Sequence, residues 1–331
     1  YCPSVEDKVV RFSENPSHQL FLEPEWNNSK QIYINGFSTS MPEEVQIEAL
    51  QTIEGLNRCE LIRPGYAIEY DYFPTYQLNS TLESKEISGL FLAGQMNGTS
   101  GYEEAAAQGL IAGVNSVQSI FNGDPFIISR SEGYIGVLID DLITKDIREP
   151  YRMFTSRAEH RLSLRQDNAD IRLSNKAIRF NLLEPNHIKV FKQHERDYNE
   201  CKNKLINESV VISGKKVSKW NLIKRANKDL NPIVEEGFSR SFSKKTLFAA
   251  ESESMYEGYV EIQSKKIETI KKLEKIKIDP SFDYTKVKNM SSESIEKLRT
   301  IKPENLGQAG RIDGMRQSDI STLSFYLYKK R

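Results

Sequence analysis

Residues 89–113, GLFLAGQMNGTSGYEEAAAQGLIAG, have the pattern of a backbone that approaches a ligand closely. An apolar stretch leads into a turn containing Gly94, Gly98 and Gly101, and a helix of small residues follows from about Tyr102. Glycine lets the chain turn where a Cβ would obstruct it, and the first amides of a helix attract negative charge. The pattern predicts a site for phosphate or a developing anion, with a ligand-free strand-to-helix connection as the alternative.

The helix after this turn has one face without bulk. Ala105, Gly109 and Gly113 are four residues apart, so that face can pack tightly beneath a sheet. No G-x-G-x-x-G motif precedes the turn anywhere in the 331 residues. If the turn belongs to a dinucleotide site, the usual phosphate-binding fingerprint is missing ahead of it.

A second chemical feature is a cluster of arginines within one short segment, which comprises Arg152, Arg157, Arg161 and Arg165. Arginine binds phosphate through two parallel hydrogen bonds and stacks on bases, so the cluster favours RNA binding. If the segment is helical, the last three arginines share a face. The alternative is internal ion pairing with the carboxylates of Glu159, Asp167 and Asp170.

A third candidate is the thiol of Cys2. Pro3 disfavours the helical region at Cys2, and Lys8 and Arg11 would favour a thiolate, which is a nucleophile. The alternative is a small buried apolar residue. We interpret Cys59 and Cys201 as structural, and the scattered cysteines and histidines give no metal-ligand spacing, so we predict no metal site.

The composition is that of a soluble protein with an uneven charge distribution. Residues 1–150 carry 9 Lys and Arg against 22 Asp and Glu, whereas residues 151–331 carry 37 against 24. A net charge of +13 on the second half suggests a polyanionic partner, and a solvated lysine-rich surface is the alternative. An odd cysteine number without a secretory signal, and no apolar run long enough to span a bilayer, indicate the cytoplasm and no membrane.

The first 125 residues alternate strand and helix patterns, which predicts part of an α/β sheet. Strands are expected at 19–24, 31–37, 67–73 and 87–94, and helices at 42–56 and 102–121. The chain begins abruptly, without an initiator Met, inside sequence of structured character. We therefore expect a piece of a longer protein.

Beyond residue 125 the patterns are mostly helical, with helices expected at 133–145, 187–206, 252–278, 292–300 and 317–328. The helix at 187–206 has an apolar stripe of Ile188, Phe191, Tyr198, Cys201 and Leu205. The helix at 252–278 has an apolar side of Met255, Tyr259, Ile262, Ile267, Ile270, Leu273 and Ile276. Loops or short helices are expected at 207–250. At 306–315 we expect a turn that either presents amides to phosphate or simply connects two helices.

Several long motifs, in the same order along the chain, resemble the MnmG (GidA) family of FAD-dependent tRNA wobble-uridine modification enzymes. They are YCPSVEDKVVRF at the start, RPGYAIEYDYF, the glycine turn, EPYRMFTSRAEHRLSLRQDNADIRL, YEGYVEIQ and IKPENLGQAGRIDGMRQSDIS. The resemblance covers the chain except residues 207–250. Where the family usually has tyrosine, this chain has His160.

The resemblance implies half of a cofactor site. The FAD contact would be Gln95, surrounded by Gly94, Asn97, Gly98, Thr99, Gly101 and Tyr102. The family also links the first motif to a nicotinamide cofactor, which implies contacts from Cys2, Pro3, Ser4, Val5, Glu6, Asp7, Lys8, Val9, Val10, Arg11 and Phe12. Cys2 and Lys8 would be its catalytic residues, and Arg152 and Arg161, followed by Arg157 and Arg165, would contact tRNA.

The resemblance further implies three regions and a reaction. Residues 1–125 would be part of an FAD-binding domain of the two-dinucleotide-binding type, 126–250 a tRNA-binding region, and 251–331 a helical subdomain for tRNA and the GTPase MnmE. The parent enzyme, a homodimer, would add a (carboxymethyl)aminomethyl group at C5 of the wobble uridine with FAD, NADH and methylene-tetrahydrofolate.

Two alternatives remain at this point. One is a non-enzymatic helical module that binds tRNA or the GTPase. The other is a related folate- and FAD-dependent tRNA uridine methyltransferase. As part of an MnmG-type enzyme, we expect this piece alone to be inactive, because the fingerprint and the second family cysteine are absent from it.

Overall fold

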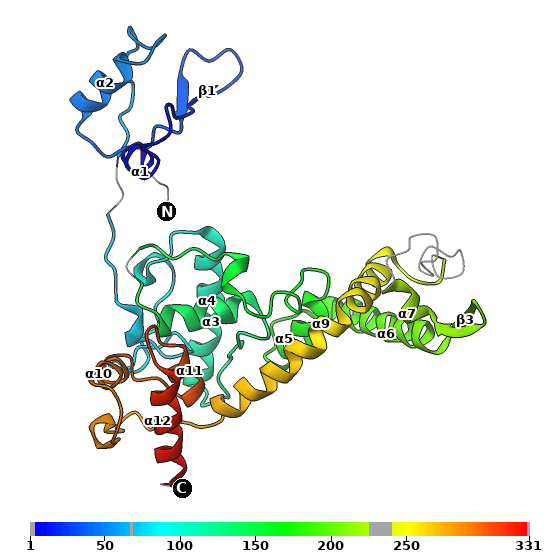
Figure 1. Ribbon diagram of the computed structural model, residues 1–331. Helices are drawn as coiled ribbons and strands as arrows, with labels where there is room; N and C mark the ends of the chain where they lie inside the picture. Colours follow the sequence, from blue (N-terminus) through cyan, green and yellow to red (C-terminus); the bar gives the residue numbers. More distant parts are fainter. Residues whose placement is uncertain (1–3, 67–68, 148, 225–239, 330–331) are drawn as a thin grey trace. The chain divides into compact units, whose positions relative to one another are not determined.

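A computed structural model describes residues 4–66, 69–147, 149–224 and 240–329 of the chain. The chain separates into two compact units, residues 1–72 and residues 73–331 (Figure 1). The first unit mixes strands with helices, and the second is built almost wholly from helices. The predicted fold class, α/β followed by a mostly helical part, is confirmed.

The first unit contains a β-hairpin and two short helices. Helix α1 (Val5–Arg11) begins at a capping box formed by Ser4 and Asp7, which satisfies amides at the start of the helix. Strands β1 (Phe21–Pro24) and β2 (Ile32–Asn35) pair antiparallel, with Phe21 opposite Asn35. Helix α2 (Glu43–Gln51) follows. The strands predicted at 19–24 and 31–37 are confirmed, although each is shorter than expected.

Three predictions for the first 125 residues need correction. The helix expected to reach residue 56 ends at Gln51, after which the chain makes single turns. The strand expected at 67–73 lies partly outside the described residues, and its described part is not a strand. The strand expected at 87–94 is wrong. Gly89 (φ +80°) and Gly94 (φ +83°) bend this segment, so it keeps only the isolated bridge between Glu83 and Phe91.

Two central helices form the body of the second unit. Helix α3 (Tyr102–Ile120) and helix α4 (Tyr134–Thr144) confirm the helices predicted there. Both contribute to one apolar core, which consists of Leu78, Leu82, Ile111, Ala112, Phe126, Ile128, Ile139 and Ile143. Helix α4 is buried along almost its whole length, which explains its nearly continuous apolar sequence.

The chain then runs into a helical arm (Figure 1). The arm comprises α5 (Ala169–Arg179), α6 (Pro185–Asn207), the hairpin of β3 (Ser209–Ile212) and β4 (Lys215–Ser218), α7 (Lys219–Ile223) and the first part of α9 (Lys244–Glu274). Its core confirms most of the stripe predicted for α6, because Tyr198, Cys201 and Leu205 pack with Trp220 and Leu247. The hairpin was not predicted.

The predicted apolar side of α9 is wrong in the middle of the helix. Met255, Tyr259 and Ile262 are 49%, 63% and 60% exposed. The helix is 31 residues long and joins two cores, the arm core at its start and the C-terminal core at its end. The apolar side chains of its central turns therefore stay exposed among the described residues, although they follow a helical apolar pattern.

The C-terminal helices form a small bundle with its own core. Helices α10 (Ser292–Ile301) and α12 (Gln317–Lys329) confirm the predicted pair. The connection expected between them as a turn contains the short helix α11 (Leu306–Arg311), in which Leu306 and Ala309 are fully buried. The remaining short elements of the second unit are 3-10 helices, namely η1 (Thr75–Gln77), η2 (Gly94–Asn97), η3 (Thr155–Arg157) and η6 (Tyr284–Lys286).

Polar contacts fasten this bundle to the loop that leads toward the glycine turn. Glu304 accepts hydrogen bonds from the amide and hydroxyl of Ser80, at 2.5 and 2.8 Å. The Nζ atom of Lys85 donates to the carbonyl oxygens of Tyr76 and Ile301, at 2.8 and 2.7 Å. Burial lowers the pKa of Lys85 to about 8, against the opposing effect of Glu304.

Two glycines provide a first prediction. A Cβ on Gly136 would collide with the carbonyl oxygens of Ile128 and Ser129, whereas a Cβ on Gly109 would meet nothing within 4 Å. We expect Gly136→Ala to lower the free energy of unfolding by roughly 1–3 kcal/mol through overpacking. Gly109→Ala should raise it by about 0.8–1 kcal/mol through helix propensity. Urea unfolding followed by circular dichroism checks both, and equal effects would contradict the packing described for α4.

Lys85 provides a second prediction, on pH. Its folded pKa of about 8 lies below its ordinary value of 10.5, so the unfolded chain binds more protons between these values. Stability from Lys85 is therefore gained as pH rises from 8 to 10.5 and lost as pH falls through that window. Urea titrations should show wild type gaining stability relative to Lys85→Met over this window.

The matched control is Lys297→Met, which removes a partly exposed lysine of the same bundle that pairs with Glu293. This variant should keep the pH dependence of wild type. A parallel pH dependence for wild type and Lys85→Met would show that Lys85 is not buried at this junction.

Candidate functional site

The predicted cofactor turn is a compact loop that needs glycine at two positions. Helix η2 is followed by Gly98, and both Gly94 (φ +83°) and Gly98 (φ +72°) have left-handed backbone conformations. A side chain at either position would strain the backbone. From outside the turn, the amide of Phe73 donates to the carbonyl oxygen of Met96, at 2.8 Å. The turn is therefore held in one shape by its sequence and its neighbours.

The predicted FAD contacts fall into two groups. Gln95 is exposed, and Tyr102 is 91% exposed. The other predicted contacts are buried, and they are Gly94, Asn97, Gly98, Thr99 and Gly101. The side chains of Asn97 and Thr99 bond to the turn itself, to the carbonyl oxygens of Leu92 and Gly94. A ligand outside the turn would meet the exposed side chains of Gln95, Met96 and Tyr102.

The prediction missed one residue that the structure brings into this turn. Gln108, on the second turn of α3, is fully buried and bonds to Gly94, Asn97 and Thr99. In the sequence, Gln108 is the one amide side chain within the apolar segment AAAQGLIAG, which indicates a buried polar group. Buried amides require hydrogen-bond partners, so this position could have been flagged as polar structure rather than surface.

Helix α3 presents an uncovered apolar face beside the turn. Gly109 and Gly113 are exposed, and a Cβ added to either would meet nothing within 4 Å. Large apolar side chains continue the same face, and Leu110, Val117, Ile120 and Phe121 are 46%, 48%, 74% and 76% exposed. Of the face predicted to lie beneath a sheet, Ala105 is half-buried beside Gly94, whereas Gly109 and Gly113 have no neighbour among the described residues. Contiguous exposed apolar surface of this kind marks an interaction site.

The start of the chain, predicted as the nicotinamide segment, is only partly described. Cys2 and Pro3 lie outside the described residues. Ser4, Glu6 and Asp7 are partly buried at the start of α1, and Lys8 donates to the carbonyl oxygen of Gly36 at 3.2 Å. Of the remaining predicted contacts, Val5 is partly buried. The exposed ones are Val9, Val10, Arg11 and Phe12.

The arginine segment is not a helix, so its arginines do not share a helical face. After η3 the chain continues in turns until α5 begins. Arg165 pairs with Asp167 at 2.9 Å and lies over the ring of Tyr256, so one predicted internal ion pair is present. Arg157 lies over the ring of Tyr151, with 4.5 Å from its guanidinium carbon to the ring centroid.

The other two arginines are more accessible. Arg152 is 43% exposed at its side chain and bonds to Glu104, on the first turn of α3, at 3.3 Å. Glu104 also accepts from the amide of Met153, at 2.9 Å. Arg161 is exposed and makes no ion pair or hydrogen bond within the described ranges of the chain. Of the four arginines, Arg161 is the one whose guanidinium is open to a phosphate.

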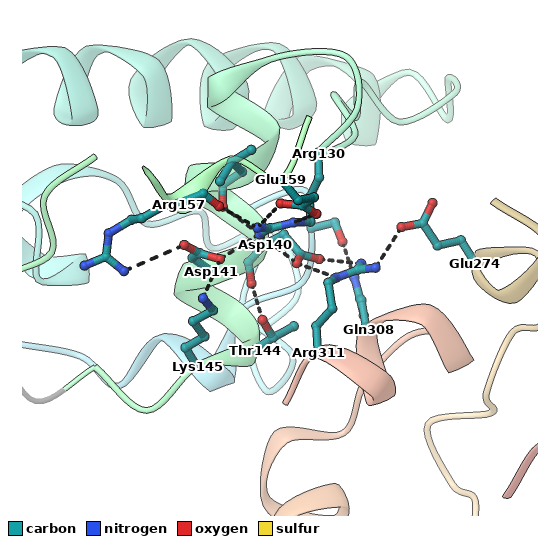
Figure 2. Close-up of polar contacts among 12 residues, drawn as sticks. Arg130, Asp140, Asp141, Thr144, Lys145, Arg157, Glu159, Glu274, Gln308 and Arg311 are labelled. Atoms are coloured by element: carbon teal, nitrogen blue, oxygen red, sulfur yellow. Dashed lines mark hydrogen bonds and ion pairs between the residues drawn. The ribbon is translucent and has the colours of Figure 1, made fainter. Parts of the chain in front are cut away.

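An ionic cluster surrounds the buried side chain of Arg130 (Figure 2). The guanidinium of Arg130 bonds to Asp140, Asp141 and Glu159, at 3.2, 2.6 and 2.8 Å. Asp140 also binds Arg311 of α11, at 2.6 Å. Arg311 belongs to the 306–315 segment, for which phosphate binding was one of two expectations. Its guanidinium is instead paired with the carboxylates of Asp140 and Glu274.

His160 and Cys201 are both buried. His160 is 4% exposed, so its ring is not accessible for stacking on a base, and burial lowers its pKa. Cys201 is fully buried in the arm core, where burial raises its pKa to about 11. A thiol of that pKa is unreactive, which agrees with its structural interpretation. Cys59 is partly buried.

The described residues form neither a metal centre nor a membrane span. Within the described ranges, no three His, Cys, Asp or Glu side chains gather as metal ligands would. Over the same ranges, no helix is both long and apolar enough to cross a membrane.

Comparison with known families gives two matches. The model for "Glucose inhibited division protein A" matches residues 1–124, and that for "tRNA modifying enzyme MnmG/GidA C-terminal helical bundle" matches residues 266–331. Together they span more than half of the chain, and they lie on either side of the arm.

Curated relatives carry the name tRNA uridine 5-carboxymethylaminomethyl modification enzyme MnmG. The protein from Syntrophomonas wolfei is 46% identical over 347 residues, which covers 100% of this chain and 56% of the relative. The protein from Karelsulcia muelleri is 48% identical over 343 residues, covering 100% and 55%. The chain thus spans about half the length of the curated relatives that it matches.

Solved structures agree with these matches. Aquifex aeolicus GidA, in two crystal forms, superposes with TM-scores of 0.84 and 0.83 at 44% and 45% identity. These superpositions cover 99% of this chain and 55% and 54% of the GidA chains. Family models, relatives and structures all agree, and the chain belongs to the MnmG (GidA) family.

Proposed function

We propose that this chain is the C-terminal part of a flavin-dependent enzyme that modifies the wobble uridine of tRNA. The observation that carries the proposal is the turn from Gly94 to Tyr102. It exposes Gln95 and Tyr102 next to an uncovered apolar face of α3. In this proposal the turn is one wall of the FAD site, and residues beyond this chain supply the other wall and cover α3.

The residues present fit a flavin in two respects. Gly94 and Gly98 keep the backbone of the turn free of side chains, and Gly101 caps α3 without a side-chain bond. Amides at the start of α3 favour negative charge nearby, as on a reduced isoalloxazine. When bound, FAD would supply the redox chemistry. Gln95 would orient its ring, and the amides would stabilise the anionic form.

The first unit would carry the nicotinamide segment and the thiol. Its contacts would come from residues 2–12, with Cys2 attacking the uracil ring and Lys8 favouring the thiolate. Lys8 already has one protein acceptor, the carbonyl oxygen of Gly36. The proposed regions remain 1–125 for the cofactors, 126–250 for tRNA, and 251–331 for tRNA and GTPase contact.

The complete enzyme would act in the cytoplasm as a homodimer with the GTPase MnmE. It would use FAD, NADH and methylene-tetrahydrofolate to add a (carboxymethyl)aminomethyl group at C5 of the uridine. The name of the curated relatives supports a tRNA uridine as the substrate and a carboxymethylaminomethyl group as the modification. A tRNA uridine methyltransferase has less support, because the relatives and family models named above are those of MnmG.

A second candidate function concerns the chain by itself, as a tRNA-binding module without activity. The exposed guanidinium of Arg161 and the net charge of +13 on residues 151–331 favour it. The two functions are compatible, because the module would deliver tRNA to the complete site.

A reconstitution assay tests the main proposal. The purified chain should show no flavin absorbance and no uridine modification. The protein extended to the length of its relatives, with MnmE and the three cofactors, should show both. Flavin binding and modification by the 331-residue chain alone would overturn the proposal that it holds half of the site.

Arg161 provides a prediction for tRNA binding. We expect Arg161→Ala to weaken binding and to reduce the slope of log affinity against log salt by about 1, because one phosphate contact is lost. Electrophoretic titrations at several salt concentrations measure the slope.

Arg165→Ala is the control with the same change in net charge. Because Arg165 is held by Asp167 and Tyr256, its loss should leave the salt slope close to that of wild type. If both variants change the slope equally, net charge alone determines binding and Arg161 makes no specific contact.

A further inference from the structure

The amide of Gln108 is fully satisfied, and three of its four hydrogen bonds go to the glycine turn. Its Oε1 atom accepts from the amide of Gly94 at 3.1 Å and from Nδ2 of Asn97 at 2.8 Å. Its Nε2 atom donates to the hydroxyl of Thr99 at 2.6 Å and to the carbonyl oxygen of Glu104 at 3.3 Å. A glutamine amide offers two acceptor positions and two donor hydrogens, so all four are used.

These bonds close a ring around Gly94. Thr99, which accepts from Gln108, donates in turn to the carbonyl oxygen of Gly94 at 2.8 Å. Both backbone polar groups of Gly94 are therefore tied to Gln108, one directly and one through Thr99. With the backbone of Gly94 held inward, the next side chain, that of Gln95, is left exposed on the outer surface of the turn.

We propose that Gln108 is a positioning residue for the cofactor turn, and this inference rests on the proposed function. Gln108 would not touch FAD, because its side chain is fully buried. It would instead fix the backbone that presents Gln95 and the amides at the start of α3. Precise support of this kind matters because a site that is loosely held binds its ligand more weakly.

Helix α3 offers a matched control in Asn115, which is 2% exposed. Its amide bonds to the backbone of Phe126, accepting from the nitrogen at 2.7 Å and donating to the oxygen at 3.0 Å. Gln108 and Asn115 are both buried amides of one helix, but they hold different loops. Gln108→Met and Asn115→Leu remove the two amides with little change in side-chain size.

Hydrogen exchange on the 331-residue chain tests the structural half of the inference. In Gln108→Met the amide of Gly94 loses its acceptor, and we expect its exchange to accelerate at least about tenfold. The amide of Phe126 should keep its wild-type rate. Asn115→Leu should show the reverse pattern. If the Gly94 amide exchanges at the same rate in wild type and in Gln108→Met, Gln108 does not hold the turn.

Flavin binding by the protein extended to the length of its relatives tests the functional half. We expect Gln108→Met to raise the FAD dissociation constant at least about tenfold and to alter the absorption bands of the flavin that remains bound. Asn115→Leu should bind FAD with the affinity and spectrum of wild type. Equal FAD binding by wild type and both variants would overturn the inference and leave the proposed function standing. If the wild-type protein itself binds no FAD, the proposed function fails, and the exchange result alone decides the role of Gln108.

Discussion

The second unit depends on one buried guanidinium. Arg130 is 8% exposed, and its charge would be costly to bury without partners. It is compensated by Asp140 and Asp141 of α4 and by Glu159 of the arginine segment (Figure 2). Asp140 also binds Arg311, so this one carboxylate connects Arg130 to the C-terminal bundle. Removing Arg130 would leave the buried carboxylates of Asp140 and Asp141 without a shared cation, which is costly.

The cluster also connects the arginine segment to the glycine turn. Tyr151 donates its hydroxyl to Asp141 at 2.9 Å and its amide to the carbonyl oxygen of Gly98 at 2.7 Å. The next residue, Arg152, bonds to Glu104 at the start of α3. The proposed RNA-binding and flavin-binding features are thus adjacent because they share anchors. An enzyme that brings a uridine to a flavin would need such proximity.

The sequence allowed prediction of the elements whose residues repeat with a clear period. Helix α6 was predicted because its apolar residues repeat along one face, and α4 because its sequence is almost continuously apolar. Helix α3 and the glycine turn were found from their composition. The exposed middle of α9 was not predictable, because periodicity does not reveal whether a neighbour is present to cover a face. The hairpin of β3 and β4 was missed because both strands are only four residues long and β4, KKVS, has a single apolar residue.

The site could be predicted in its type more readily than in its contacts. Four arginines lie in one segment of the sequence, but some of their partners are distant along the chain, such as Glu104 for Arg152 and Tyr256 for Arg165. The pairing of Arg165 with the nearby Asp167 was considered as an alternative, but the sequence did not show which arginine would be left exposed. Long-range partners are set by the packing of α3, α4 and α9, and one sequence alone does not contain that information.

The central claim is that the turn from Gly94 to Tyr102 is one wall of a flavin site completed by residues outside this chain. A structure of the protein at the length of its relatives, determined with FAD bound, tests it most directly. The account predicts the isoalloxazine ring beside Gln95, with the exposed face of α3 covered by the added residues. Flavin bound elsewhere, with Gln95 and that face still open to solvent, would contradict it.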